Sequence, residues 1–253
     1  DTILRLKESQ YNPKNMVLSV AGNVSHGEVL EMTEKNLADW TFGTPFTSFP
    51  LKEKDCQLDK SAVEYSKTDR GYLSLSWPGL SVVEDDRFAL DLLGTVLGGG
   101  MTSRLFLELR ERKALVYDVY SSVVHLTDCG AITINFASDP ARAKDVVGIV
   151  LKECEKLQDM NVSKQEIIRA VELSKGRIIM RVENSRSIAS WVGMQEILAN
   201  RLLSLDDVVS SYEAVTPGDL RRVAGNLLGR DKCLLAAVGP FETLGTFANF
   251  SVW

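Results

Sequence analysis

The histidines and cysteines of this chain are the side chains that most often bind metals or act as nucleophiles. There are two histidines, His26 and His125, and neither lies one helical turn from the other. The cysteines form no C-x-x-C pair, and they are Cys56, Cys129, Cys154 and Cys233. A zinc site built from this chain alone would require distant residues to converge, so we assign neither histidine to a metal. Catalysis of the Ser-His-Asp or Cys-His type would have to use one of only two imidazoles.

Sequence context gives these residues ordinary structural roles. We expect His26 on the surface of a capped helix and His125 at a turn that ends a strand. The wide spacing of the cysteines is typical of buried thiols rather than of a disulfide framework. It favours a reducing compartment of the cytoplasmic type.

Three consecutive glycines, Gly98-Gly99-Gly100, are the next feature that could carry chemistry. A glycine loop that cradles phosphate follows a strand and is followed by Gly-Lys-Ser/Thr. Here the run follows an expected helix, and no such tripeptide comes after it. The glycines are therefore read as a helix C-cap and turn, not as a phosphate site.

Arg110 and Tyr117 lie seven positions apart in the segment 97–120, L-G-G-G-M-T-S-R-L-F-L-E-L-R-E-R-K-A-L-V-Y-D-V-Y. On spacing alone, the pair is more typical of a solvated helix residue and a strand aromatic than of a site. Arg110 has Glu108 and Glu111 as possible partners on its own helix.

The segment as a whole resembles the C-terminal half of the pitrilysin/insulinase zinc peptidases, which include the processing peptidases and use an inverted H-x-x-E-H zinc motif. The matching features are the glycine run, Ser103-Arg104-Leu105-Phe106, Arg110-Glu111 and Leu115-Val116-Tyr117. Further matches extend the resemblance over nearly the whole chain: Tyr11-Asn12-Pro13-Lys14-Asn15-Met16, Val215-Thr216-Pro217 and the A-V-G-P at 237–240.

The resemblance implies a catalytic unit of two homologous α+β domains that face each other. The first domain of that family carries H-x-x-E-H and a downstream Glu ligand. The second binds no metal and supplies an Arg and a Tyr, seven positions apart, that reach the bound peptide. Arg110 and Tyr117 match this spacing, and we expect them to be the catalytic contacts. The resemblance also implies a substrate-binding loop made of Gly98, Gly99, Gly100 and Ser103. Zn²⁺ would then belong to the full enzyme, with its ligands outside this chain.

The chemistry of the two side chains is consistent with those implied roles. A neutral phenol placed at the scissile carbonyl oxygen stabilises the negative charge that develops there. A guanidinium is a rigid fork that holds carbonyls or carboxylates of a substrate. The chain departs from the family at Ala114, where the family usually has glycine. If that position requires a positive φ, alanine strains the turn before Tyr117.

Composition and charge exclude several other classes of protein. The chain has 253 residues and a mass of 28.0 kDa, with 45% hydrophobic and 25% charged residues, which excludes wholesale disorder. The net charge is −5 and the basic residues are scattered, so we expect no nucleic-acid partner. No apolar run approaches the roughly 18 residues of a membrane span.

Periodicity and capping signals predict the elements that must position the site. Capping boxes are expected at Ser25 to Glu28 and at Ser163 to Glu166, and Thr102 and Ser103 can cap a short helix. Apolar residues alternate with polar ones at 73–77 and 131–137, and they form a helical stripe between 146 and 157. Strands are expected at 16–21, 62–65, 73–77, 117–124, 131–137 and 233–238. Helices are expected at 26–40, 163–184, 186–201 and 205–214, and further helices are expected to start at 85, after Thr102 and Ser103, at 139 and at 216. Clustered strands with hairpins, followed by helices, favour an α+β fold with an antiparallel sheet packed against helices. The resemblance makes this a metallohydrolase-like domain of the processing-peptidase type, from a duplicated two-domain protein.

The two ends of the chain contain a partial repeat. M-V-L-S-V-A-G at 16–22 matches C-L-L-A-A-V-G at 233–239, and a helix is expected before each. With Ile3 and Leu6 showing buried character at the very start, this suggests a duplicated domain. We expect 1–42 to be the last helix-strand-helix part of a first domain, 43–61 to be a linker, and 62–253 to be a complete second domain that binds no metal.

Three hypotheses about function remain open. The first is the C-terminal substrate-binding half of a zinc metalloendopeptidase that hydrolyses peptides or unfolded polypeptides, inactive without its H-x-x-E-H half. That half would be an N-terminal domain or a homologous partner subunit. The second is a non-catalytic partner subunit or core-type structural homologue of the same family. The third is an unrelated α+β binding module, which would be favoured if Arg110 and Tyr117 were buried or far apart.

Overall fold

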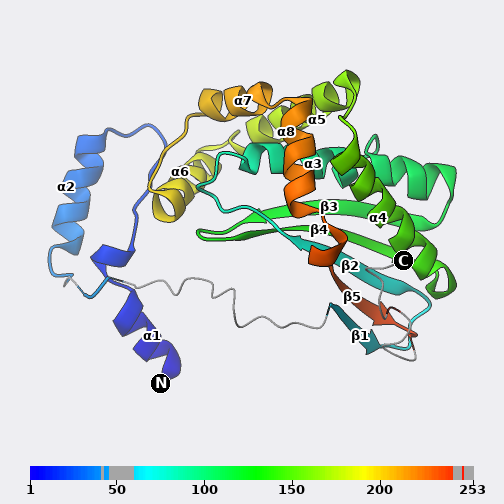
Figure 1. Ribbon diagram of the computed structural model, residues 1–253. Coiled ribbons are helices and arrows are strands. Elements are labelled where there is room, and N and C mark those ends of the chain that lie inside the picture. Colours follow the sequence, from blue (N-terminus) through cyan, green and yellow to red (C-terminus); the bar gives the residue numbers. More distant parts are fainter. Residues whose placement is uncertain (41–42, 46–59, 242–246, 248–253) are drawn as a thin grey trace. The chain divides into compact units, whose positions relative to one another are not determined.

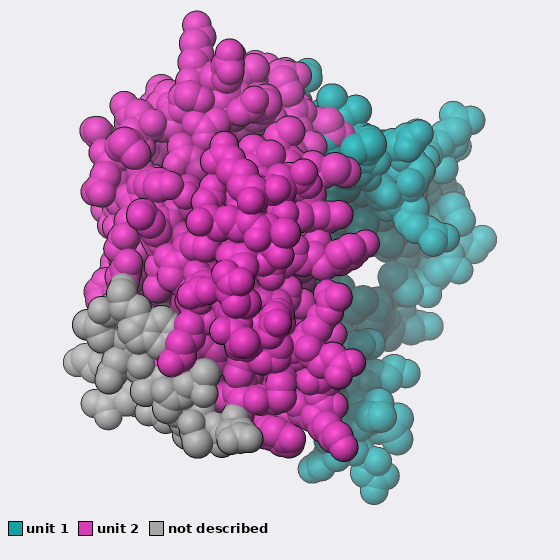
Figure 2. Space-filling view, turned by 90° about the vertical axis from the view of Figure 1, so that its right-hand side faces the viewer, with its two compact units in different colours: residues 1–51, 177–207 teal, residues 52–176, 208–253 magenta. Residues whose placement is uncertain are grey.

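The computed structural model describes residues 1–40, 43–45, 60–241 and 247. The chain divides into two compact units, coloured separately in Figure 2. Unit 1 comprises residues 1–51 and 177–207, and unit 2 comprises 52–176 and 208–253. Most of the predicted linker 43–61 lies outside the described residues, and the predicted domain boundaries remain a prediction.

A five-stranded sheet forms the centre of unit 2, with strand order β1-β5-β2-β4-β3. Its strands are β1 (Ser61–Tyr65), β2 (Gly71–Pro78), β3 (Val116–His125), β4 (Gly130–Ser138) and β5 (Leu234–Gly239). All neighbouring pairs are antiparallel except β1 and β5, which run parallel. The hairpin of β3 and β4 was predicted, and β3 forms one edge of the sheet.

Helices cover one face of this sheet, as Figure 1 shows for α3, α4 and α8. The helices with residues in unit 2 are α3 (Arg87–Gly98), α4 (Ala143–Asp159), α5 (Lys164–Arg181), α7 (Leu205–Ala214) and α8 (Pro217–Leu227). The apolar stripe of α4 predicted from 3.6-residue periodicity is buried. This arrangement confirms the predicted α+β class.

Alternation along the strands separates the two faces of the sheet. Leu73, Leu75 and Trp77 of β2 are buried on the helix side, together with Ile132, Ile134 and Phe136 of β4. The intervening residues point to the opposite face, where Tyr72 is 55% exposed. Of the helices described in unit 2, α3, α4 and α8 lie on the first face, and we call the second face, which carries the exposed Tyr72, the open face.

Capping interactions begin most of the helices where the sequence predicts. Ser163 and Glu166 form the capping box of α5, and Thr216 and Asp219 form that of α8. A 3₁₀ turn, Pro140–Arg142, precedes α4. The predicted cap at Ser103 is wrong, because its hydroxyl is buried and has no hydrogen-bond partner among the described residues.

Unit 1 contains α1 (Thr2–Gln10), the 3₁₀ turn Pro13–Asn15, α2 (His26–Leu37) and α6 (Ser185–Ala199). The capping box of Ser25 and Glu28 opens α2 as predicted. The predicted strand 16–21 is wrong, because no described strand pairs with this segment and a strand needs a backbone partner. The predicted burial at the start is wrong too, since Ile3 is 82% exposed.

The cysteines that the structure describes are free thiols. Cys154 and Cys233 are buried, as predicted, and Cys129 is half-buried. Burial raises the pKa of Cys233 to about 12, which keeps this thiol protonated and unreactive. Cys56 lies outside the described residues.

No helix in the described ranges is both long enough and apolar enough to cross a membrane.

Candidate substrate-binding site

Arg110 lies on a short helix that precedes β3. This helix begins at Arg104 and is π-helical over Phe106–Arg112. Leu105 and Leu109 anchor it, since both are fully buried in the core of unit 2. A π-helical turn is rare and often lies at a functional site, so its position here draws attention to Arg110.

The guanidinium of Arg110 contacts two aromatic rings. Its Cζ atom lies 4.9 Å from the ring centre of Phe106 and 4.9 Å from that of Tyr117. Both distances are within the range of a cation–π interaction. No described carboxylate forms an ion pair with Arg110, so its charge remains available to a ligand.

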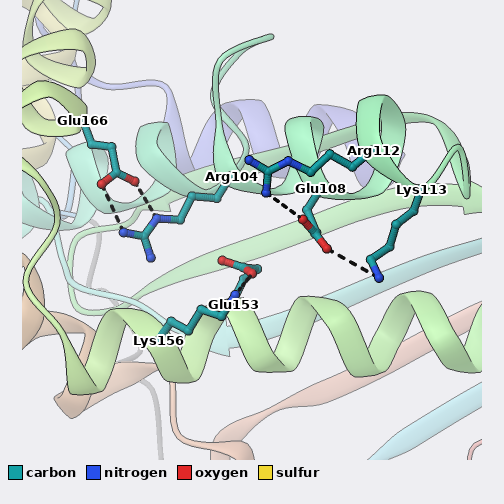
Figure 3. Close-up of polar contacts among 7 residues, drawn as sticks. All are labelled: Arg104, Glu108, Arg112, Lys113, Glu153, Lys156 and Glu166. Atoms are coloured by element: carbon teal, nitrogen blue, oxygen red, sulfur yellow. Dashed lines mark hydrogen bonds and ion pairs between the residues drawn. The ribbon is translucent and has the colours of Figure 1, made fainter.

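Two neighbouring cations, one on this helix and one directly after it, are paired, in contrast. Arg112 binds Glu108 at 3.1 Å, and Lys113 binds the other oxygen of Glu108 at 3.6 Å (Figure 3). These contacts, the hydrogen bond from Arg112 above all, hold the pKa of Glu108 below its usual value, although burial opposes the shift. Glu108 therefore pairs with Arg112 and Lys113 rather than with Arg110.

Ala114 turns the chain from this helix into β3. Its φ is +47°, in the left-handed region that favours glycine. This turn lets the N–H of Leu115 donate to the carbonyl of Leu109 at 2.8 Å and so closes the helix. The position therefore requires the positive φ considered in the sequence analysis, and alanine occupies it at a cost in free energy.

Tyr117 lies in a β-bulge. Val116 pairs with Ser138 and Val119 with Phe136, so Tyr117 and Asp118 together stand opposite the single residue Ala137. A bulge re-aims side chains and is common beside active sites. Here it leaves Tyr117 69% exposed, with its ring against Arg110.

A groove on the open face of the sheet begins at Tyr117. Its volume is about 680 Å³, and side chains of β2, β3, β4 and β5 line it. The lining residues include Tyr72, Ser74, Tyr117, Asp118, Tyr120, Asn135, Ala236 and Val238. Of these, only Tyr117 was predicted from the sequence. The alternation of β2 and β4 predicted which side chains share a face, but not which distant strands become neighbours.

The glycine run and Ser103 do not line this groove. A Cβ atom on Gly98 would lie 2.6 Å from the backbone nitrogen of Ser121, so Gly98 allows α3 to pack closely on β3. Ser103 is only 4% exposed. The structure thus brings Arg110 and Tyr117 together, and it leaves Gly98, Gly99, Gly100 and Ser103 outside their groove.

An ion pair fixes the start of the Arg110 helix. The Nε and Nη2 atoms of Arg104 donate to the two carboxylate oxygens of Glu166, at 2.7 and 3.3 Å (Figure 3). Burial opposes ionisation of Glu166, but hydrogen bonds from Arg104 and Ser163 outweigh it and lower the pKa of this carboxyl to about 2. A bidentate pair of this kind restrains the helix against α5.

His125 takes part in a separate network on the helix side of the sheet. One ring nitrogen lies 2.7 Å from the carbonyl of Leu80 and the other 3.2 Å from Asp91, which also accepts a hydrogen bond from Tyr212. His125 is the last residue of β3, as predicted. No group of three or more His, Cys, Asp or Glu side chains in the described part of the chain is placed to hold a metal.

Comparison with known proteins gives the family. A family model described as the peptidase M16 inactive domain matches residues 1–173. The chain belongs to the M16 peptidase family. This confirms the insulinase-type resemblance of the segment around Arg110 and Tyr117.

Named M16 relatives are similar along nearly the whole chain. An uncharacterized zinc protease of Streptomyces coelicolor is 31% identical over 247 residues, which cover 96% of this chain and 54% of that protein. The bovine mitochondrial-processing peptidase subunit beta is 25% identical over 249 residues, covering 94% and 50%. The M16 chain therefore spans about half the length of these relatives.

Solved structures share the fold. A peptidase M16 inactive domain from Pseudomonas fluorescens superposes with a TM-score of 0.77 at 20% identity, covering 87% of this chain and 52% of that one. A chain of complex III from Candida albicans gives a TM-score of 0.73 at 15% identity, covering 91% and 57%.

Proposed function

We propose that this M16 chain is the substrate-binding half of a zinc metalloendopeptidase and that Arg110 and Tyr117 contact the peptide bond to be cleaved. The observation that carries the proposal is the pairing of these two side chains. A guanidinium without a carboxylate partner among the described residues lies 4.9 Å from the ring centre of an exposed tyrosine. The names of the relatives, zinc protease and processing peptidase, support the same reaction class.

The two side chains have different roles in this proposal. The Tyr117 hydroxyl donates a hydrogen bond to the scissile carbonyl oxygen as negative charge develops on it. Arg110 binds a neighbouring carbonyl or carboxylate of the peptide and, through its cation–π contact, holds the Tyr117 ring in position. Neither role requires a metal ligand on this chain.

The described residues do not themselves fit a zinc site, since they form no cluster of metal-binding side chains. We therefore place the Zn²⁺ of the full enzyme, and its H-x-x-E-H motif, on a part outside the described residues. That part is an N-terminal domain of the same polypeptide or a homologous subunit. The substrate is a peptide or an unfolded polypeptide.

The test is steady-state peptide cleavage by the chain assembled with its zinc-binding half. Tyr117→Phe should lower kcat by roughly 10²–10³-fold with little change in KM, because the hydroxyl acts in the transition state. Arg110→Met should lower kcat, because Tyr117 is held less firmly, and should also raise KM, because a contact with the bound substrate is lost.

Matched controls exist in the same unit. Tyr65→Phe removes the hydroxyl of another exposed tyrosine at the opposite edge of the sheet, and Arg112→Met removes a neighbouring cation. Both should leave kcat and KM unchanged. A Tyr117→Phe variant as active as the wild type would contradict the catalytic assignment.

A second candidate function is a non-catalytic subunit of the same family. The similarity of fold to a chain of complex III favours it. In that case the assembled protein would cleave no peptide, and Tyr117→Phe would change nothing but local stability.

A further inference from the structure

Register in the sheet places the groove residues in two rows that cross the strands. The first row consists of Val238, Tyr72 and Ala137, because Tyr72 pairs with Val238 on one side and with Ala137 on the other. The bulge at Tyr117 and Asp118 continues this row onto β3. It is therefore a row that contains two exposed tyrosine rings.

The second row lies two residues further along the strands, and its side chains protrude less from the sheet than the tyrosines of the first row. Ser74 pairs with Ala236 and with Asn135, and Asn135 pairs with Tyr120. Ser74, Asn135 and Ala236 are small or medium in size, so they form a floor, which we call the trough. Tyr72 and Tyr117 form its wall on one side, and Tyr120, 51% exposed, stands at its end.

The chemistry of the trough suits an uncharged guest. Its floor carries the Ser74 hydroxyl, the Asn135 amide and the Ala236 methyl group, none of them charged, and tyrosine rings and the side chain of Val238 surround it. Two charged residues line the groove, Arg70 and Asp118, and their charges are opposite. Rings offer a large apolar contact area, while neither sign of charge on a guest side chain is favoured overall.

The trough adjoins the pair of Arg110 and Tyr117, so its occupant would be a side chain of the peptide substrate. Tyr117 both contacts Arg110 and lines the groove, so a peptide held at Tyr117 has side chains that reach the trough. In an extended peptide, alternate side chains point to one side, so one residue of the substrate enters while its neighbours point away.

We propose that the trough formed by Ser74, Asn135 and Ala236, with Tyr72 as its wall, is a specificity subsite that takes one bulky apolar side chain, aromatic or branched aliphatic, of the peptide held at Tyr117. This inference rests on the proposed peptidase function and adds the residues that select the substrate.

The experiment compares peptide pairs that are identical except for Phe or Ala at one residue, scanned over four positions on each side of the cleaved bond. The enzyme is the chain assembled with its zinc-binding half. The wild type should prefer Phe by roughly tenfold in kcat/KM at one position, as expected for partial burial of one such side chain. Ala236→Phe fills the trough and should reduce this ratio to about one.

A second variant and a control distinguish loss of the trough from misfolding of the protein. Tyr72→Ser removes the wall without adding bulk, and it should reduce the same ratio. Val124→Phe adds an aromatic ring to the same face of the sheet, outside the groove residues, and should leave the ratio unchanged. Circular dichroism confirms that each variant is folded.

The outcomes distinguish the subsite from the peptidase function. If the wild type cleaves peptides but Ala236→Phe and Tyr72→Ser keep the Phe preference, the subsite is wrong and the peptidase function stands. If the wild type cleaves nothing, the proposed function is wrong. Fluorescence anisotropy with the same peptides, carrying a fluorescent label, then measures their binding to the trough. Weaker binding of the Phe peptide to Ala236→Phe than to the wild type supports the subsite, and equal binding overturns it.

Discussion

Replacement of Ala114 by glycine should stabilise unit 2. Ala114 is one of two non-glycine residues with a positive φ in the described ranges, at +47°, and it connects the helix of Arg110 to the strand of Tyr117. A left-handed conformation costs an L-residue with a Cβ atom roughly 1–2 kcal/mol. Glycine removes this cost, because it has no Cβ atom to meet the following carbonyl oxygen.

The gain is smaller than the strain, because glycine also makes the unfolded chain more flexible. That entropy disfavours folding by about 0.4–1 kcal/mol. The difference predicts that Ala114→Gly raises the free energy of unfolding of unit 2 by roughly 0.5–1 kcal/mol, since about half of the relieved strain is offset. For a unit of this size the midpoint of thermal unfolding would rise by roughly 1–4 °C.

The assay is urea unfolding monitored by hydrogen exchange in peptides from β3 and β4, because the two units need not unfold together. The control is Ala214→Gly, an exposed residue at the end of α7 whose φ is not positive. That change should destabilise by about 0.5–1 kcal/mol, because helical glycine loses entropy without relieving strain. The reasoning is refuted if Ala114→Gly destabilises unit 2 as Ala214→Gly does.

Two further predictions concern the elements that hold the site. Gly98→Ala should destabilise unit 2 by about 1–3 kcal/mol in urea unfolding, because the added methyl group would meet the backbone of β3. The control Gly148→Ala, in open space on α4, should stabilise unit 2 by up to about 1 kcal/mol. The lowered pKa of Glu166 contributes stability that is present above the unfolded value near 4.5 and is lost as pH falls toward about 2. Unfolding of Glu166→Gln should therefore depend less on pH between about 4.5 and 2, and an unchanged profile would show that the pair with Arg104 contributes nothing.

Local signals predicted most elements of the fold. The capping boxes at Ser25, Ser163 and Thr216 began their helices where expected, because a side-chain cap acts within one helical turn. Alternation in β2 and β4 predicted the buried face. The prediction of a strand at 16–21 was wrong because a strand, unlike a helix cap, depends on a distant partner. The apolar pattern of the segment does not show whether the described chain supplies that partner.

The candidate site was predictable only in part. The motif around Arg110 and Tyr117 was recognisable because both residues lie in one short segment. The groove beside them was not, because Tyr72, Asn135 and Ala236 come from three strands that are distant in the sequence and meet through sheet register. No pattern in a single sequence encodes that register across non-adjacent strands.

Three departures from regular backbone lie between Phe106 and Asp118. They are the π-helical segment, the left-handed Ala114 and the bulge at Tyr117. Each disfavours folding locally, and regular structure at any one of them would move Arg110 or Tyr117. An alternating strand would point Tyr117 and Asp118 to opposite faces, whereas the bulge lets both line the same groove. All three lie on the segment that joins the guanidinium of Arg110 to the phenol of Tyr117, so together they set how these two groups are placed.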